Sequence, residues 1–186
     1  MPAPDPRPWT GTVYRHLSAG SPYGPLDTRY AARSRENLWN QAGEPTLLLA
    51  GSRALATLEF AQHIARNRDG ELTALYRQRQ LFQIELRLYR VFDLTDGATL
   101  DALGIAGAPA CFTDRSVARA TAGFLRHTRA ADGLLVPSLS APDNREHWNL
   151  LVFLDRLTEP LDAAALRITE LDTFQIDPQS YRSESR

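Results

Sequence analysis

The stretch from Thr46 to Arg66 constrains the fold more than any other part of the sequence. It begins with an apolar run at 46–50, is interrupted at Gly51-Ser52, and continues with apolar residues at helical spacing. Ser52 is placed to cap a helix, because its hydroxyl can accept from a free amide of the first turn. We therefore predict a buried strand, a tight turn and an amphipathic helix. The expected apolar face of the helix consists of Ala54, Leu55, Leu58, Ala61 and Ala65.

Glu59 lies within this helix, beside the apolar face. A carboxylate in this position is either partly buried with a partner or placed at the edge of a cleft. The alternative is a solvent-exposed glutamate on the flank of the helix, and the stretch by itself favours that alternative.

Composition limits the class of protein. The chain has 186 residues, of which 43% are hydrophobic and 23% charged, as is usual for one globular domain with a sizeable core. A net charge of −1 creates no global attraction to nucleic acid or to anionic lipid. The 21 basic residues are all arginines. This excludes mechanisms that need a Schiff-base lysine or a P-loop lysine.

Cysteine and histidine usage gives further limits. Cys111 is alone, so a disulfide within the chain is impossible, and we expect a cytoplasmic protein. The four histidines are scattered along the chain, which disfavours a structural zinc site, and we expect no bound metal. The N-terminus lacks the pattern of a signal peptide, and no apolar run reaches the ~18 residues of a membrane span. We therefore expect no contact with membranes.

The remaining chain predicts one domain at 10–176, between a loose proline-rich arm at 1–9 and a frayed tail at 177–186. The order of elements is irregular, which favours an α+β fold over a repeated βαβ array. Further strands are expected at 10–17, 81–91, 133–137, 148–155 and 166–176, and further helices at 99–103 and 114–129, the latter capped by Asp114.

Two features near the N-terminus are candidates for ligand binding. Arg15 shares a strand face with Val13, and a buried arginine usually has an anionic partner; the alternative is an exposed arginine on an edge strand. The segment 18–45 is long and irregular, and it carries several aromatic residues and arginines. These side chains can line a nucleotide pocket by stacking and phosphate pairing, or pack on the core.

Taken in order, several segments of the chain resemble the RES domain family. They read VYR at 13–15, LWNQAGEPTLLLAGSRALATLE at 38–59, VFDLTDGATLDALGI at 91–105, DGLLVPS at 132–138 and NLLVFLDRL at 149–157. No segment is diagnostic alone, but the ordered set is fairly specific.

The family is named for an arginine, a glutamate and a serine, which by motif fall on Arg15, Glu59 and Ser138. The resemblance implies an ADP-ribosyltransferase-like fold, in which a split, mostly antiparallel sheet has flanking helices and a cleft where these three residues meet. Members of the family act as toxins of bacterial toxin–antitoxin pairs. They deplete NAD by phosphorolysis or hydrolysis of the nicotinamide–ribose bond, and one branch is associated with ADP-ribosylation of a protein.

The resemblance also implies a substrate, a partner and a role for each residue. NAD is the substrate, inorganic phosphate is the co-substrate of phosphorolysis, and the partner is a small helix-turn-helix antitoxin. Glu59 would hold a ribose hydroxyl and stabilise an oxocarbenium-like transition state. Arg15 would bind the pyrophosphate or an attacking phosphate. Ser138 would hydrogen-bond to ribose or phosphate; the alternative is a serine that caps a strand. The oligomeric state stays open, with a homodimer among the alternatives.

Two positions depart from the family pattern. Leu38 stands where an arginine is common, and Leu48 stands where a tyrosine is common. We expect Tyr30 and Arg35, or Arg33 in place of Arg35, to supply the missing substrate contacts. The leading hypothesis is an NAD-degrading toxin. The alternatives are transfer of ADP-ribose to a protein, and a degenerate RES domain that binds a nucleotide or a partner without turnover.

Overall fold

Six strands and four α-helices form an α+β domain in the described part of the chain. The computed structural model describes residues 4–33, 37–66, 78–140 and 146–175. The strands are β1 (Arg7–Ser18), β2 (Thr46–Ala50), β3 (Gln78–Asp93), β4 (Gly133–Pro137), β5 (Trp148–Phe153) and β6 (Ala165–Gln175). The helices are α1 (Arg53–Arg66), α3 (Gly97–Ala102), α4 (Arg115–Thr128), α5 (Leu161–Ala164) and the 3₁₀-helix η1 (Ala110–Thr113).

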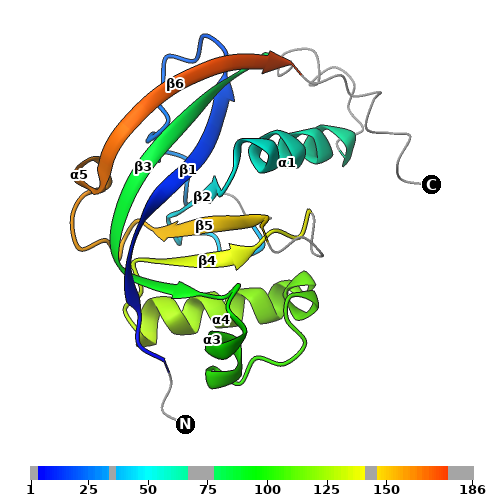
Figure 1. Cartoon of the computed structure of the whole chain (residues 1–186), viewed down its shortest axis with the longest axis vertical. Coiled ribbons are helices and arrows are strands. Elements are labelled where there is room, and N and C mark those ends of the chain that lie inside the picture. Colours follow the sequence, from blue (N-terminus) through cyan, green and yellow to red (C-terminus); the bar gives the residue numbers. More distant parts are fainter. Residues whose placement is uncertain (1–3, 34–36, 67–77, 141–145, 176–186) are drawn as a thin grey trace.

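The strands form one sheet in the order β1-β2-β5-β4-β3-β6, and a further pairing of β1 with β3 closes the first five strands into a ring. In Figure 1, β1, β3 and β6 are long curved strands that run side by side. Only β3 and β4 are parallel among the described pairs, so the prediction of a mostly antiparallel sheet is confirmed.

The structure does not have the split that we expected in the sheet. The strand β3 has 16 residues. Its length lets it pair with β1 and β6 along most of its course, and with β4 at Val91–Asp93. The two expected halves are therefore joined in one continuous hydrogen-bonded ladder.

The ring encloses an apolar core, because alternate residues of its strands point inward. The register of β2 and β5 brings Leu47 opposite Val152 and Leu49 opposite Leu150. These four side chains are buried in one cluster with Val13 and with residues of β3. The alternating pattern predicted for β3 has the same origin, since Ile84, Leu86 and Leu88 belong to this cluster.

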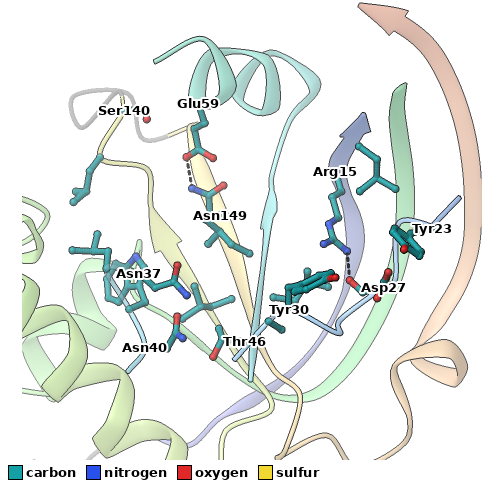
Figure 2. Close-up of a pocket in the computed structure, with 18 of the residues that line it drawn as sticks. Arg15, Tyr23, Asp27, Tyr30, Asn37, Asn40, Thr46, Glu59, Ser140 and Asn149 are labelled. Atoms are coloured by element: carbon teal, nitrogen blue, oxygen red, sulfur yellow. Dashed lines mark hydrogen bonds between the residues drawn. The ribbon is translucent and has the colours of Figure 1, made fainter. Parts of the chain in front are cut away.

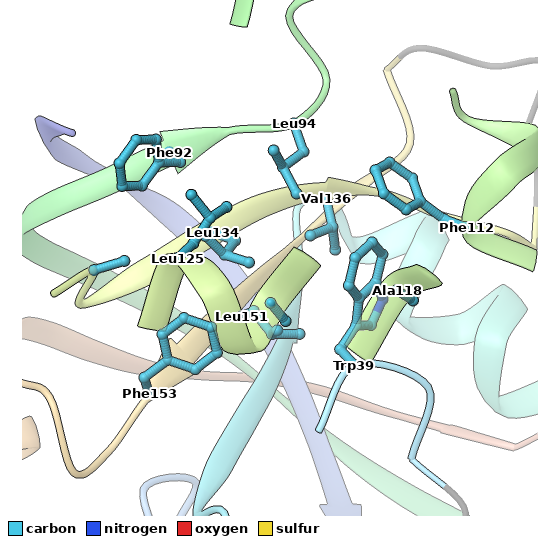
Figure 3. Close-up of a cluster of buried hydrophobic side chains, with 12 residues drawn as sticks. Trp39, Phe92, Leu94, Phe112, Ala118, Leu125, Leu134, Val136, Leu151 and Phe153 are labelled. Atoms are coloured by element: carbon cyan, nitrogen blue, oxygen red, sulfur yellow. The ribbon is translucent and has the colours of Figure 1, made fainter. Parts of the chain in front are cut away.

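A second core lies where α4 covers the outer face of β4 and β5 (Figure 3). Ala118, Ala122 and Leu125 of the helix pack there against strand residues and against Trp39. As predicted, the side chain of Asp114 caps the helix by accepting from the backbone amide of Ser116. The strand residues of this core are Phe92, Leu134, Val136, Leu151 and Phe153, and Leu94 joins them from the turn after β3.

The turn between β2 and α1 places the helix beside the sheet. A Cβ added to Gly51 would lie 2.6 Å from ring atoms of Trp148, so only glycine fits at this position. The amide of Gly51 donates to the carbonyl of Trp148 at 2.8 Å. Ser52 caps the helix as predicted, because its hydroxyl accepts from the amide of Leu55 at 3.1 Å.

The buried face of α1 is rotated relative to the prediction. It consists of Leu55, Ala56, Phe60, Ala61 and Ile64, whereas Ala54 is exposed. The ring of Phe60 stacks near His16 and Phe174, at centroid distances of 4.7 and 6.3 Å. These aromatic contacts from other strands set the rotation of the helix, and the sequence around α1 does not reveal them.

The N-terminal arm is shorter than predicted. The strand β1 already begins at Arg7, and Trp9 pairs with Leu88 of β3 and packs edge-on against Trp148 at 6.2 Å. Pro8 coincides with a register shift between Arg7 and Trp9. A proline lacks the amide needed for the ladder and is tolerated at such a bulge. The expected tail at 177–186 lies outside the described residues.

Candidate functional site

A cavity of about 570 Å³ opens between β1, β2, β5, α1 and the segment that joins β1 to β2. Figure 2 shows Glu59 and Asn149 on one side of it and Arg15 with Asp27 on the other. Tyr30 lies between these two groups in the view. The cavity therefore brings together residues from elements that are far apart in the sequence.

Glu59 is held at the cavity wall by two hydrogen bonds. Its Oε1 accepts from the hydroxyl of Ser138 at 3.0 Å and from Nδ2 of Asn149 at 2.6 Å. Both donors are buried, with Ser138 at 1% and Asn149 at 4% exposure. Within the described residues, Oε2 has no hydrogen-bond partner and remains free to accept from a ligand. The carboxylate is thus oriented before any ligand arrives.

Ser138 stands behind the carboxylate, since it does not line the cavity. Its hydroxyl donates to Glu59 and accepts from the amide of Ser140 at 3.2 Å. Its own amide donates to the carbonyl of His147 at 2.9 Å. This geometry suits a residue that positions Glu59 better than one that contacts a ligand.

Arg15 reaches the cavity from β1. Its Nη1 donates to the carbonyl oxygens of Pro25 and of Asp27, the latter at 3.2 Å. Burial lowers the pKa of Arg15 below its ordinary value, and the charge of Asp27 partly opposes this. Nε and Nη2 make no hydrogen bond to any residue that the structure describes. The expected anionic partner is thus replaced by carbonyl groups, and two donor nitrogens remain for a ligand.

The segment between β1 and β2 is folded on itself at the cavity rim. Arg29 binds the carboxylate of Asp27 in a fork, with Nε–Oδ1 at 3.0 Å and Nη2–Oδ2 at 2.7 Å. Arg29 thereby lowers the pKa of Asp27 to about 2. The guanidinium of Arg29 also lies 3.7 Å from the ring centre of Tyr23, and that of Arg33 lies 4.7 Å from Tyr30. These contacts engage two of the arginines that could otherwise pair with phosphate, as the alternative of a segment packed on the core implies.

His16 follows Arg15 on β1 but does not line the cavity. Its Nδ1 accepts from Nε of Arg79 at 3.0 Å. Burial, with smaller effects of Arg79, Arg15 and His63, lowers the pKa of His16 to about 3. The ring is therefore neutral at physiological pH, and it serves as an acceptor in the packing beneath α1.

Both departures from the family pattern face the cavity. Leu48 is 46% exposed and Leu38 is partly buried against the core under α4, and each lines the cavity. Apolar surface therefore stands where an arginine and a tyrosine are common in the family.

The structure places the predicted site residues as follows. Arg15 and Glu59 line the cavity from opposite sides, and Ser138 contacts Glu59 from behind. No direct contact joins Arg15 to Glu59 in the described ranges. Tyr30 lines the cavity with 62% of its surface exposed, whereas Arg35 lies outside the described residues.

Asn149 is the site residue that the sequence analysis missed. It is the only amide in the strand WNLLVF, and a polar side chain in a buried apolar strand needs hydrogen bonds to offset its desolvation. A single polar residue in an otherwise apolar strand was the sequence signal that could have identified it. The strand was interpreted only as an apolar element, so the amide was not connected with Glu59.

The arrangement suits a ligand that carries both hydroxyl groups and an anionic group. A fixed carboxylate oxygen can accept from hydroxyl groups and stabilise positive charge that develops nearby. An arginine with free donors on the opposite side can bind a phosphate. The residues that the structure describes contain no group of three metal-ligating side chains. Nor do they contain a helix of the length and apolarity that a membrane crossing requires.

Comparisons with known proteins bear on the fold and on the family of the chain. No curated protein sequence matches the chain significantly. Among solved structures, a chain from the crystal structure of the M. tuberculosis MbcT–MbcA toxin–antitoxin complex is similar, with a TM-score of 0.62 and 19% identity over 95% of this chain and 90% of that chain. At this identity the likeness supports the fold alone. The family model of the RES domain matches residues 12–175. The chain therefore belongs to the RES domain family.

Proposed function

We propose that the protein is a toxin of a toxin–antitoxin pair and that it cleaves NAD at the nicotinamide–ribose bond. The observation that carries this proposal is the orientation of Glu59, whose carboxylate is held at the cavity wall by Ser138 and Asn149. RES domains resemble ADP-ribosyltransferases, and the proposal includes that likeness in fold. The cytoplasm is the compartment where NAD and an antitoxin would be met.

The proposed reaction breaks the bond between the ribose C1′ and the ring nitrogen of nicotinamide. The bonding electrons leave with the nitrogen, so nicotinamide departs as a neutral molecule and the ribose becomes oxocarbenium-like. The carboxylate of Glu59 stabilises that positive charge. A water molecule then bonds to C1′ and releases a proton, or a phosphate oxygen bonds to C1′ instead.

Arg15 binds the anionic part of the substrate in this proposal. Its Nε and Nη2 can donate to the pyrophosphate or to an attacking phosphate. Nη1 is held by the carbonyls of Pro25 and Asp27, and these contacts fix the direction of the fork. Tyr30 offers an exposed aromatic face between the two groups, where a base can stack.

An antitoxin partner forms part of the same proposal. The similar solved chain comes from a toxin–antitoxin complex, which supports a partner of that kind here. The RES resemblance favours a small helix-turn-helix protein with a segment that fills the cavity.

One observation favours a second candidate function, binding of a nucleotide or partner without turnover. Leu38 and Leu48 give the cavity apolar surface where the family commonly has polar NAD contacts. Weaker substrate binding would reduce or abolish cleavage.

The test is incubation of the purified protein with NAD, with and without inorganic phosphate, followed by chromatography of the products. We expect nicotinamide together with ADP-ribose for hydrolysis, or with ADP-ribose 1″-phosphate for phosphorolysis. ADP-ribose attached to protein would instead favour transfer to a target. If no nicotinamide is released under any of these conditions, the catalytic proposal is wrong and the binding function is favoured.

A further inference from the structure

Asn149 occupies an unusual position for an amide side chain. It lies on β5, opposite Ala50 of β2 and Val136 of β4, and only 4% of its surface is exposed. It nevertheless lines the cavity beside Glu59. A buried amide in the middle of three paired strands is costly unless its polar atoms are hydrogen-bonded.

The hydrogen bond to Glu59 fixes which way the amide faces. A carboxylate oxygen only accepts, so the atom 2.6 Å from Oε1 must be the donor Nδ2. The amide oxygen Oδ1 must then point away from Glu59. Figure 2 shows it beside the nitrogen, on the side away from the bond to Glu59.

The oxygen Oδ1 is an unused acceptor. It is buried and has no hydrogen-bond partner within the described residues. Oε2 of Glu59 is a second acceptor without a partner there. Two oxygen acceptors are therefore held together at the cavity wall by the bond between Nδ2 and Oε1, and neither can rotate to become a donor.

Two fixed neighbouring acceptors are complementary to a ligand with two neighbouring hydroxyl donors. We propose that Oδ1 of Asn149 and Oε2 of Glu59 bind the cis-diol of a ribose, with one hydroxyl on each oxygen. This inference rests on the proposed function, and the ribose concerned is the one attached to nicotinamide. Asn149 is then both a substrate contact through Oδ1 and a positioning residue for Glu59 through Nδ2.

Ser138 provides a matched control, because it donates to the same Oε1 but does not line the cavity. Removing its hydroxyl loosens Glu59 without removing a contact to the ligand. Asn149→Ala removes both the donor to Glu59 and the acceptor Oδ1. Only the asparagine variant should therefore show coupling to a particular ligand hydroxyl.

The experiment is a thermodynamic cycle in which a protein side chain and a ligand hydroxyl are removed separately and together. Wild type, Asn149→Ala and Ser138→Ala are each compared on NAD and on its analogues lacking the 2′- or the 3′-hydroxyl of the nicotinamide ribose. We expect Asn149→Ala to lower kcat/KM for NAD about tenfold more than Ser138→Ala does, as for the loss of one further hydrogen bond. On one deoxy analogue the losses in the two variants should agree within about twofold, since that analogue already lacks the bond to Oδ1 and only the positioning of Glu59 is lost. Ser138→Ala should lower kcat/KM by the same factor on all three ligands.

The outcomes separate the inference from the proposed function. A wild type that does not cleave NAD contradicts the proposed function, and the same cycle is then measured as dissociation constants by calorimetry. An equal loss for Asn149→Ala on NAD and on both analogues overturns the diol inference in either format. Failure of the wild type both to cleave and to bind NAD overturns both.

Asn149→Asp separates the contact of Oδ1 with the ligand from the positioning of Glu59 by Nδ2. It also keeps the inference testable if Asn149→Ala does not fold. Aspartate keeps an acceptor oxygen but replaces the donor to Glu59 with a second carboxylate. Like charges at this distance raise the pKa of one member of the pair. The acid limb of the pH–rate profile should move upward, while discrimination between NAD and the deoxy analogues is retained above that limb. An unchanged profile, or lost discrimination at high pH, would contradict the assignment.

Discussion

Replacement of Glu59 by glutamine separates charge from geometry at the candidate site. The oxygen of the glutamine can take the place of Oε1, where it still accepts from Ser138 and Asn149, bonds of 3.0 and 2.6 Å in the wild type. The new NH₂ group then stands where Oε2 has no protein partner. The variant therefore keeps its hydrogen bonds within the protein, and loses the negative charge together with the acceptor that Oε2 offers to a ligand.

We expect Glu59→Gln mainly to lower the turnover number. Removal of a preorganised electrostatic contact typically lowers turnover on the order of 100-fold or more, which corresponds to about 2.7 kcal/mol in the activation barrier. The free energy of unfolding should change by less than about 0.5 kcal/mol, because no buried hydrogen bond is lost. Glu59→Ala should be less stable than Glu59→Gln, since it leaves the buried donors of Ser138 and Asn149 unpaired.

The assay compares nicotinamide release and thermal unfolding for wild type, Glu59→Gln and a control, Glu170→Gln. Glu170 is exposed on β6, away from the cavity, so its variant should match the wild type in both measurements. Wild-type turnover in Glu59→Gln, beside an active wild type, would refute the assigned role of the carboxylate. A large loss of stability in Glu59→Gln would refute the reasoning from the retained hydrogen bonds.

Three further predictions concern other residues. Arg15→Ala should raise the dissociation constant for NAD as well as lower turnover, because a phosphate contact exists before the reaction; calorimetry that finds unchanged affinity would contradict this. Leu38→Arg combined with Leu48→Tyr should lower KM more than it changes kcat, since uniform binding affects both states equally; an unchanged KM would mean that other residues supply these contacts. The pKa of His16, about 3, lies below its unfolded value of about 6.5. The unfolded chain therefore binds more protons between these values, and stability should fall as pH decreases through this window, by at most about 1.4 kcal/mol per pH unit. Urea unfolding from pH 6 to 4.5 should show a flatter dependence for His16→Gln, and an equal slope would contradict the assignment.

The sequence predicted those parts of the fold that depend on local signals. The caps at Ser52 and Asp114 were predicted because a hydroxyl or carboxylate binds amides only two or three residues away. The bounds of β4 were predicted correctly because a glycine and a proline delimit its apolar run. The RES motifs placed Arg15 and Glu59, which line one cavity in the structure.

Features that depend on distant contacts were not predicted. Closure of the ring requires β1 to pair with β3 in a specific register, and the alternation within each strand does not identify its partner. Trp9 was assigned to a loose arm because its contact with Trp148 is invisible from the proline-rich sequence around it. Asn149 was missed for the same reason, since its meaning depends on Glu59, 90 residues away.

The spacing of the donors to Glu59 has a consequence for synthesis of the chain. They lie 79 and 90 residues downstream of the glutamate, and the second is on β5, which is inserted between β2 and β4. On the ribosome, Glu59 therefore emerges long before anything can orient it. Until β5 has emerged, β2 and β4 present open edges that are prone to pair with other chains. The complete cavity therefore forms only after most of the polypeptide has been made. Fragments released earlier are expected to aggregate through their open strand edges, but they lack the oriented carboxylate of Glu59.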